Sequence, residues 1–241
     1  MSHPALPFTR EHLRALGHQG LRVVGDVHGE AAAFEAACEG AAAARLFVVQ
    51  LGDLTDHGPD SPAVLRRMFG LIDAKAGLFL LGNHDHKLRR ALVGAKVSTG
   101  NGLALTLAHI DAAPDREALM ARTIEEVARA PAWLRAGPSL FVHGGYHDAM
   151  LHNPAPEDAG ARKPDGVVTR ALFGQVTGRT RADGFPERLH DWVARIPDGL
   201  TVYCGHEVRS RDGLPYRDGN ALFLDTGAGK GGHLSWVDLA F

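Results

Sequence analysis

The chain has 241 residues, of which 45% are hydrophobic, 22% charged and 7% aromatic. This composition is typical of a globular protein and excludes a disordered or fibrous one. Basic residues number 26 and acidic residues 28, so the formal net charge is −2. We therefore expect no extended nucleic-acid footprint, and any bound anion must be held locally.

The cysteines and the N-terminal residues bear on the compartment. Cys38 and Cys204 are far apart and form no Cys-x-x-Cys motif, so we expect neither a disulfide framework nor a cysteine zinc site. Residues 1–20 lack the apolar core of a signal peptide. No apolar run approaches the roughly 20 residues of a membrane span. We expect a cytoplasmic protein that has no membrane partner.

In chain order, short apolar runs that end in a glycine or histidine turn predict five buried strands. They cover residues 21–24, 46–51, 78–81, 140–142 and 200–204. Helical patterns at 31–44 and 62–74 separate the first three strands, and Ser61 is a candidate N-cap of the second helix. This alternation of strand and helix favours a parallel sheet.

The second half continues the same α/β pattern. Residues 101–134 have a helical pattern with a start at residues 114–115, and strands are predicted at 221–224 and 233–241. No linker or low-complexity segment interrupts the chain. We expect a single α/β domain over residues 1–241, with residues 1–20 as an N-terminal extension.

Polar residues follow the predicted strands. In an open α/β sheet, ligands gather at strand ends, and here those ends carry Asp26, His28, Asp53, Asp56, Asn83, His84, His143 and His206. Carboxylate, imidazole and amide ligands suit manganese, iron, zinc or nickel better than calcium. A single aspartate there can be only a turn former or cap. The whole series predicts two ions that share a carboxylate, a clamp for displacement at phosphorus.

These motifs resemble the signature of the calcineurin-like metallophosphoesterases, in the branch that contains the phosphoprotein phosphatases. They are GDVHG (25–29), GDLTDHG (52–58), GNHD (82–85), VHGG (142–145) and GHE (205–207). Within this branch, residues 58–66, 88–94 and 171–178 resemble the phosphatase module of bacterial polynucleotide kinase-phosphatase. The resemblance implies a central β-sandwich flanked by helices (αββα) and a binuclear, metal-dependent phosphoric ester hydrolase.

Matched motif by motif, the resemblance also implies residue roles. Asp26 and His28 would hold the first ion, Asp53 would bridge both ions, and Asn83, His143 and His206 would complete the second site. Manganese is the expected ion, with iron, zinc or nickel as options. A hydroxide between the ions would attack phosphorus. His84 would protonate the leaving oxygen while Asp56 orients it; the alternative is that His84 only positions Asn83.

One position departs from the family pattern. His57 stands where the family has an arginine that clamps phosphate, and imidazole is a weaker, mostly neutral partner. We therefore expect weaker phosphate binding, unless another cation substitutes. The candidates are Lys87, Arg89, Arg179 and Arg181. Accordingly, His57→Arg is predicted to lower KM for phosphomonoesters.

Two further features lie near the C-terminus. Asp225 resembles a residue at the edge of the site that the polynucleotide phosphatase branch uses with cyclic phosphates, but it can equally be a turn aspartate. Residues 227–232 (GAGKGG) lack the spacing of a nucleotide-binding P-loop and no helix pattern follows them. We therefore expect no kinase module.

Three functions are compatible with these residues. The first is a phosphatase for phosphomonoesters, including nucleotide, RNA-end or cyclic phosphates. The second keeps the site but acts as a protein serine/threonine phosphatase or a dinucleoside polyphosphate hydrolase. The third is a catalytically silent phosphate-binding domain, against which His84 and Asp56 argue because a purely structural site needs neither. The oligomeric state does not follow from the sequence.

Overall fold

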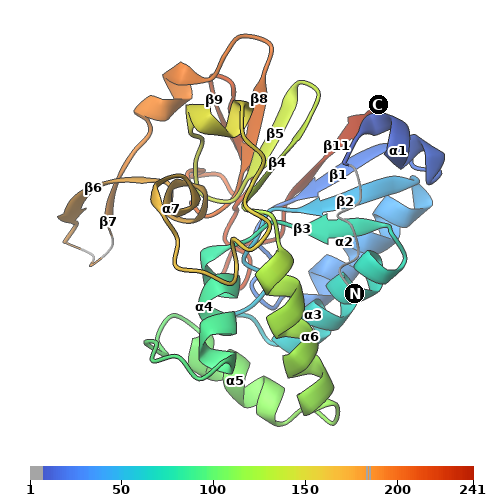
Figure 1. Cartoon of the computed structure of the whole chain (residues 1–241), viewed down its shortest axis with the longest axis vertical. Coiled ribbons are helices and arrows are strands. Elements are labelled where there is room, and N and C mark those ends of the chain that lie inside the picture. Colours follow the sequence, from blue (N-terminus) through green and yellow to red (C-terminus); the bar gives the residue numbers. More distant parts are fainter. Residues whose placement is uncertain (1–7, 183, 185) are drawn as a thin grey trace.

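The computed structural model describes residues 8–182, 184 and 186–241. Its first sheet has four strands, and the last strand of the chain lies beside the first (Figure 1). In spatial order they are β11 (Trp236–Ala240), β1 (Gly20–Val24), β2 (Leu46–Gln50) and β3 (Gly77–Phe79). Strands β1, β2 and β3 are parallel, while β11 runs antiparallel to β1. The loops after β1, β2 and β3 therefore leave from one edge of the sheet.

A second sheet of five strands comes from the second half of the chain. In spatial order its strands are β4 (Trp133–Ala136), β5 (Ser139–Val142), β8 (Thr201–Cys204), β10 (Ala221–Phe223) and β9 (Tyr216–Asp218). The three central strands are parallel, and the two outer strands are antiparallel to their neighbours. A separate two-stranded ribbon projects from this half and consists of β6 (Gln175–Thr180) and β7 (Pro186–Leu189).

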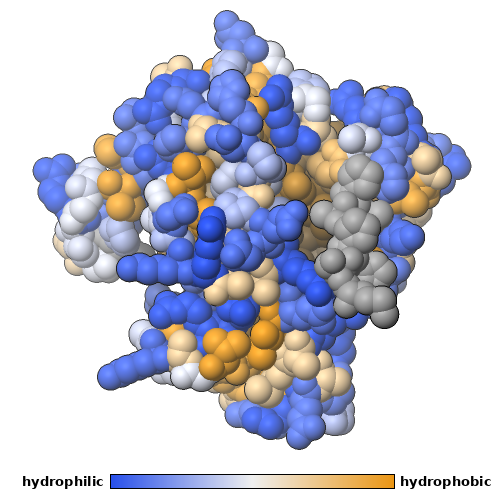
Figure 2. Space-filling model, viewed as in Figure 1, coloured by the Kyte–Doolittle hydropathy of each residue, from blue (hydrophilic) through white to orange (hydrophobic). Residues whose placement is uncertain are grey.

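Helices pack around the two sheets and beyond the ends of their strands (Figure 1). They are α1 (Arg10–Ala15), α2 (Ala31–Ala43), α3 (Ser61–Asp73), α4 (Asn83–Leu92), α5 (Leu103–Asp111), α6 (Arg116–Arg129) and α7 (Gly166–Phe173), with 3₁₀ turns η1 (Asp148–Leu151) and η2 (Asp191–Arg195). Helix α2 packs on β2, α3 packs on β3, and α4 packs on α6. Most of the face in Figure 2 is hydrophilic, with hydrophobic side chains gathered over the region of α4, α5 and α6.

The two faces of the first sheet belong to different hydrophobic clusters. Val23 and Val49 are buried together with Phe141 of the second sheet, so the sheets pack face to face. Val24 and Val48 point the other way and are buried in the cluster that includes the helices, as the alternation of side chains along a strand requires. Each such burial contributes about 1.5–3 kcal/mol. The predicted αββα fold is confirmed.

The start of α3 corrects the predicted cap. Ser61 was predicted to be the N-cap, but the cap is Asp60, whose side-chain oxygen accepts a hydrogen bond from the Ala63 amide at 2.9 Å. The Ser61 hydroxyl instead accepts a hydrogen bond from the Asp56 amide at 3.2 Å. Both side chains have the capping chemistry, and the neighbouring loop decides which one uses it.

Two other segments differ from the sequence prediction. The helical pattern over 101–134 is interrupted, because Ala130 adopts an extended conformation before Pro131 and β4 begins at Trp133; the residue before a proline avoids the helical region. Residues 83–92 form α4, although their polar composition gave no apolar helical pattern. This helix begins directly at a strand end, where its first residues face the site.

The remaining expectations concern the termini, the thiols and the membrane. Residues 1–7 of the predicted N-terminal extension lie outside the described residues, whereas Leu13 of α1 is buried in the cluster between the sheets. Cys38 and Cys204 are both buried and free. Among the helices of the described residues, none combines the length and the apolar character that crossing a bilayer requires.

Candidate metal centre

The strand ends of both sheets bring the predicted site residues together. Five of the ten predicted positions are in the left-handed backbone region, with φ of 45° at His28, 59° at Asp53, 76° at Asp56, 64° at His57 and 69° at His206. Such conformations are uncommon for residues other than glycine and persist where surrounding contacts impose them. The loops are therefore held in shapes that aim these side chains at one point.

The first candidate site consists of Asp26, His28 and Asp53. Their candidate ligand atoms lie within 4.8 Å of one another, and His28 Nε2 is 3.8 Å from a carboxylate oxygen of each aspartate. His28 Nδ1 donates to the Thr55 carbonyl at 2.8 Å, which leaves Nε2 buried without a hydrogen-bond partner. A buried, unpartnered nitrogen beside two carboxylates fits a metal ligand.

The second candidate site shares Asp53 with the first. Ligand atoms of Asp53, His143 and His206 lie within 4.8 Å of one another. His143 Nε2 is 3.4 Å from Asp53 Oδ2 and 3.0 Å from Asn83 Oδ1. His206 Nε2 is buried without a hydrogen-bond partner. The six predicted ligands thus form two groups with one common carboxylate, a donor set that fits two divalent cations.

The electrostatics of these groups suit a site for divalent cations. Burial and the charge of Asp225 raise the pKa of Asp26 well above its usual range. Burial lowers the pKa of His28 to about 3. Burial also opposes the charged form of His143, but its attraction to Asp53 outweighs this and raises the pKa to about 9. Divalent cations would neutralise the carboxylates and hold the imidazoles as neutral ligands.

His84 and Asp56, the predicted catalytic pair, are in direct contact. His84 Nδ1 lies 2.5 Å from Asp56 Oδ2, and the Thr106 hydroxyl donates to the other oxygen of Asp56 at 2.6 Å. Burial lowers the pKa of His84, yet the charges of Asp53 and Asp56 outweigh it and raise the pKa above its usual value. Since Nδ1 is engaged, Nε2 is the nitrogen left to exchange a proton with a substrate.

Asp85 is a site residue to which the sequence analysis assigned no role. One of its carboxylate oxygens accepts hydrogen bonds from the amides of Asp53 at 2.7 Å and Gly82 at 3.1 Å, and the other accepts from Leu54 at 3.0 Å. Burial raises the pKa of Asp85 to about 7. Asp85 therefore fixes the loop that carries the shared carboxylate. Its place in the GNHD motif was the available signal.

His57 lies at this site, as its motif indicates. Its ring centroid is 5.0 Å from that of His28 and 5.4 Å from that of His84, and burial lowers its pKa. The proposed substitutes for the missing arginine have other partners. Lys87 donates to the Gly100 carbonyl, Arg89 donates to the Ile124 carbonyl, Arg179 pairs with Glu187, and Arg181 is also engaged.

Asp225 borders the first group. It is 2% exposed, and its side-chain oxygen accepts a hydrogen bond from the Gly227 amide at 2.9 Å, which is the pattern of a turn-forming aspartate. Burial raises its pKa, and its charge acts on Asp26. Asp225 thus shapes the following loop and also adds negative potential beside the ligands.

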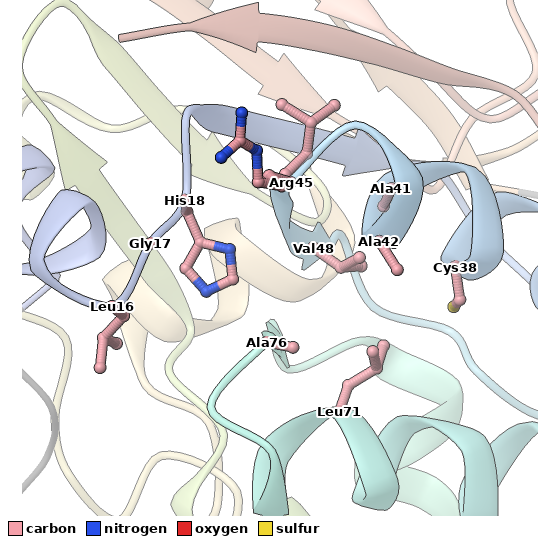
Figure 3. Close-up of a pocket in the computed structure, with 11 residues that line it drawn as sticks. Leu16, Gly17, His18, Cys38, Ala41, Ala42, Arg45, Val48, Leu71 and Ala76 are labelled. Carbon is pink, nitrogen blue, oxygen red and sulfur yellow. The ribbon is translucent and has the colours of Figure 1, made fainter.

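A cavity of about 260 Å³ lies elsewhere, at the amino ends of the same strands. Figure 3 shows Cys38, Ala41 and Ala42 of α2 across from Leu71 and Ala76. No group of metal-ligating side chains of the described residues belongs to this lining. Because the cavity is lined mainly by apolar residues and lies at the opposite edge of the sheet, the strand-end cluster is the candidate chemical site.

Residues 21–210 match the family model described as calcineurin-like phosphoesterase. The chain belongs to this family. The matched segment spans both ligand groups, and with their geometry it identifies the protein as a metal-dependent phosphoesterase, a hydrolase, as predicted.

Two curated relatives carry the same name, bis(5′-nucleosyl)-tetraphosphatase PrpE (asymmetrical). The chain is similar to that of Halalkalibacterium halodurans, with 32% identity over 77% of this chain and 72% of the relative. It is also similar to that of Geobacillus thermodenitrificans, with 33% identity over the same shares.

Among solved structures, the fold is similar to a protein serine/threonine phosphatase from Saccharomyces cerevisiae, with a TM-score of 0.61, 14% identity and coverage of 96% of this chain and 87% of that chain. That likeness concerns the fold alone. The finer resemblance to the polynucleotide kinase-phosphatase module stays a prediction.

Proposed function

We propose that this protein hydrolyses dinucleoside polyphosphates at the strand-end metal centre. The observation that carries this proposal is the similarity, over about three quarters of both chains, to PrpE enzymes named for asymmetrical tetraphosphate hydrolysis. Asymmetrical cleavage of four phosphates releases a nucleoside triphosphate and a nucleoside monophosphate. This reading was an alternative in the sequence analysis, and the comparisons favour it over phosphomonoester hydrolysis.

Six residues would hold two ions in this reaction: Asp26, His28, Asp53, Asn83, His143 and His206. When bound, the ions neutralise charge at phosphorus and lower the pKa of a water molecule. Manganese is the resident ion that we propose, because the mixed carboxylate, imidazole and amide set suits it. Asp85 keeps the shared aspartate in place through the amides of its loop.

The His84–Asp56 pair would handle the proton of the leaving oxygen. Asp56 accepts a hydrogen bond from His84 Nδ1 and favours the charged imidazole, so His84 can donate a proton from Nε2. In an anhydride the leaving group is itself a phosphate, whose second pKa is about 6. Such a group departs with less help from an acid than an alkoxide does. His84 should therefore matter less for a dinucleoside polyphosphate than for an alkyl phosphate.

The test is a panel of substrates with the purified protein in manganese, and with magnesium, zinc or nickel in parallel. The panel contains diadenosine tetraphosphate, a phosphopeptide, a 2′,3′-cyclic nucleotide and an RNA 3′-phosphate. We expect the highest kcat/KM for diadenosine tetraphosphate, with adenosine triphosphate and monophosphate as products on anion-exchange chromatography. A kcat/KM at least as high for any other member would contradict the proposal.

One observation favours a second candidate, a phosphatase that acts on nucleotide or RNA-end phosphates, including cyclic ones. Asp225 is buried beside the first ligand group and acts electrostatically on Asp26. The sequence resemblance associates this position with cyclic phosphates. The cyclic nucleotide and the RNA 3′-phosphate in the panel decide between the two candidates.

A further inference from the structure

We propose that Lys230 binds the substrate phosphate and supplies the positive charge that the family pattern places at position 57. This proposal deepens the proposed function and rests on phosphate-ester or anhydride hydrolysis at the same metal centre. Residues 227–232 lack the spacing of a P-loop, so no nucleotide-binding role is expected of them. The structure gives the lysine in this segment a different setting.

The loop that carries Lys230 is packed onto the metal centre. Gly229 has φ of +71°, and a Cβ there would lie 2.6 Å from the His28 carbonyl oxygen and 2.8 Å from His28 Cβ. Only glycine avoids this overlap. The residue directly before Lys230 therefore touches the backbone of a candidate ligand, and no side chain separates the two.

Hydrogen bonds fix the shape of this loop. The amides of Lys230 and Gly232 both donate to the Gly227 carbonyl, at 3.0 and 2.9 Å, and the Gly227 amide donates to Asp225 Oδ1 at 2.9 Å. The loop is thus a closed turn anchored to the buried Asp225. A closed turn fixes the backbone of the lysine, and the flexible stem of a lysine lets its ammonium group reach more than one position.

The charge of Lys230 acts on the site. It lowers the pKa values of His28 and His57, each in addition to the larger effect of burial. It also opposes the raised pKa of Asp225, which burial causes. Its side chain is exposed, and no carboxylate of the described residues forms an ion pair with it. An exposed cation whose charge reaches the candidate ligands is available to an anion.

The other cations of the site region are engaged. Arg188 affects the pKa of His206, but it donates to the Phe173 carbonyl and lies 4.0 Å from Glu207. Lys87, Arg89 and Arg179 hold the partners described above. Lys230 is therefore the residue whose chemistry and position suit the missing phosphate clamp.

A lysine differs from an arginine in this role. Its ammonium group is a point charge with three donors on a flexible stem, whereas guanidinium is a planar fork that binds two oxygens at once. Lys230 can therefore reach either of two adjacent phosphates. Because it is exposed, its contribution should fall as salt increases.

The first test compares Lys230→Gln with Lys75→Gln, an exposed lysine at the opposite edge of the sheet. In Lys230→Gln we expect KM for p-nitrophenyl phosphate and Ki for inorganic phosphate to rise about tenfold, the loss of one charge-assisted contact at a partly screened site. We expect kcat and the metal content, measured by mass spectrometry, to stay within about twofold of wild type. Lys75→Gln should match wild type in all four quantities.

The second test is a rescue. Adding His57→Arg to Lys230→Gln should restore most of the lost affinity, because it returns the charge to the family position. Raising the salt concentration should increase KM less in Lys230→Gln than in wild type. Lys230→Arg should keep KM close to wild type.

Three results would overturn the proposal. The first is an unchanged KM and Ki in Lys230→Gln. The second is an equal shift in Lys75→Gln. The third is a joint loss of kcat and metal, which would indicate a structural loop. None of these measurements uses a nucleotide. If the wild-type protein fails to hydrolyse diadenosine tetraphosphate, the proposed function is wrong, but the role of Lys230 is still tested by the phosphate measurements.

Discussion

The two edges of the first sheet differ in chemistry although the same strands connect them. At the carboxyl edge, His28 has a buried nitrogen without a hydrogen-bond partner beside buried aspartates, and His206 of the second sheet adds another such nitrogen there. At the amino edge, the cavity in Figure 3 is lined mainly by small apolar side chains of α2 and by Leu71. The strands β1, β2 and β3, which connect the two edges, are largely buried along their length. The difference shows that residues just beyond each strand, and not the strands, set the chemistry.

The largest effect should come from the carboxylate common to both ligand groups. Replacing a group that only orients a metal ligand costs about 10–100-fold, so we expect Asp53→Asn to lower kcat/KM by about a thousandfold and to reduce bound metal. Metal analysis and initial rates in manganese measure this. Asp111→Asn, an exposed aspartate that pairs with Arg116, is the control. Full activity with two ions in Asp53→Asn would contradict the shared-ligand geometry.

The next largest effect should come from His84, the candidate proton donor, which lies at the same edge as the candidate metal ligands. We expect His84→Asn to lower kcat by about 100–1,000-fold for an alkyl phosphate such as glycerol phosphate, because His84 would protonate an alkoxide. For diadenosine tetraphosphate the loss should be at least tenfold smaller, since the leaving phosphate is a far weaker base. Equal losses on both substrates would indicate that His84 only positions Asn83.

At the amino edge we expect a substitution to change the stability of the protein but not its catalytic activity. Leu71 is 6% exposed and lines the cavity. Leu71→Ala should lower the free energy of unfolding by about 2–4 kcal/mol, because it enlarges an apolar cavity. Urea titration measures this, and kcat/KM of the folded enzyme should equal that of wild type. A loss of metal in this variant would show that the two edges are coupled.

The smallest effect should come from His57→Arg in the wild-type background. We expect KM for phosphomonoesters to fall by about threefold, because guanidinium adds a permanent charge where Lys230 already supplies one. Steady-state kinetics at constant ionic strength measure the change. The fall should be larger when Lys230 is glutamine, and a raised KM would show that His57 has another task.

Much of the fold and of the candidate site followed from the sequence. Seven of the nine strands in the two sheets were predictable because apolar runs and turn residues are local patterns, whereas β4 and β9 were not predicted. Helix α4 was not predicted because its polar residues show no apolar periodicity. Strand β4 was not predicted because the helical pattern before it concealed the break at Ala130. The candidate ligand residues were recognisable by type and order, whereas the residues that hold them in place were not.

The sequence by itself determined which side chains follow each strand, and with them the chemistry available at the sheet edge. Only the tertiary structure decided which of them meet and what supports them. The His206 amide donates to Asp26 at 3.0 Å across 180 residues of sequence, and Asp85 holds the Asp53 loop. Local propensities are properties of neighbouring residues, but such contacts exist only after packing has brought distant loops together.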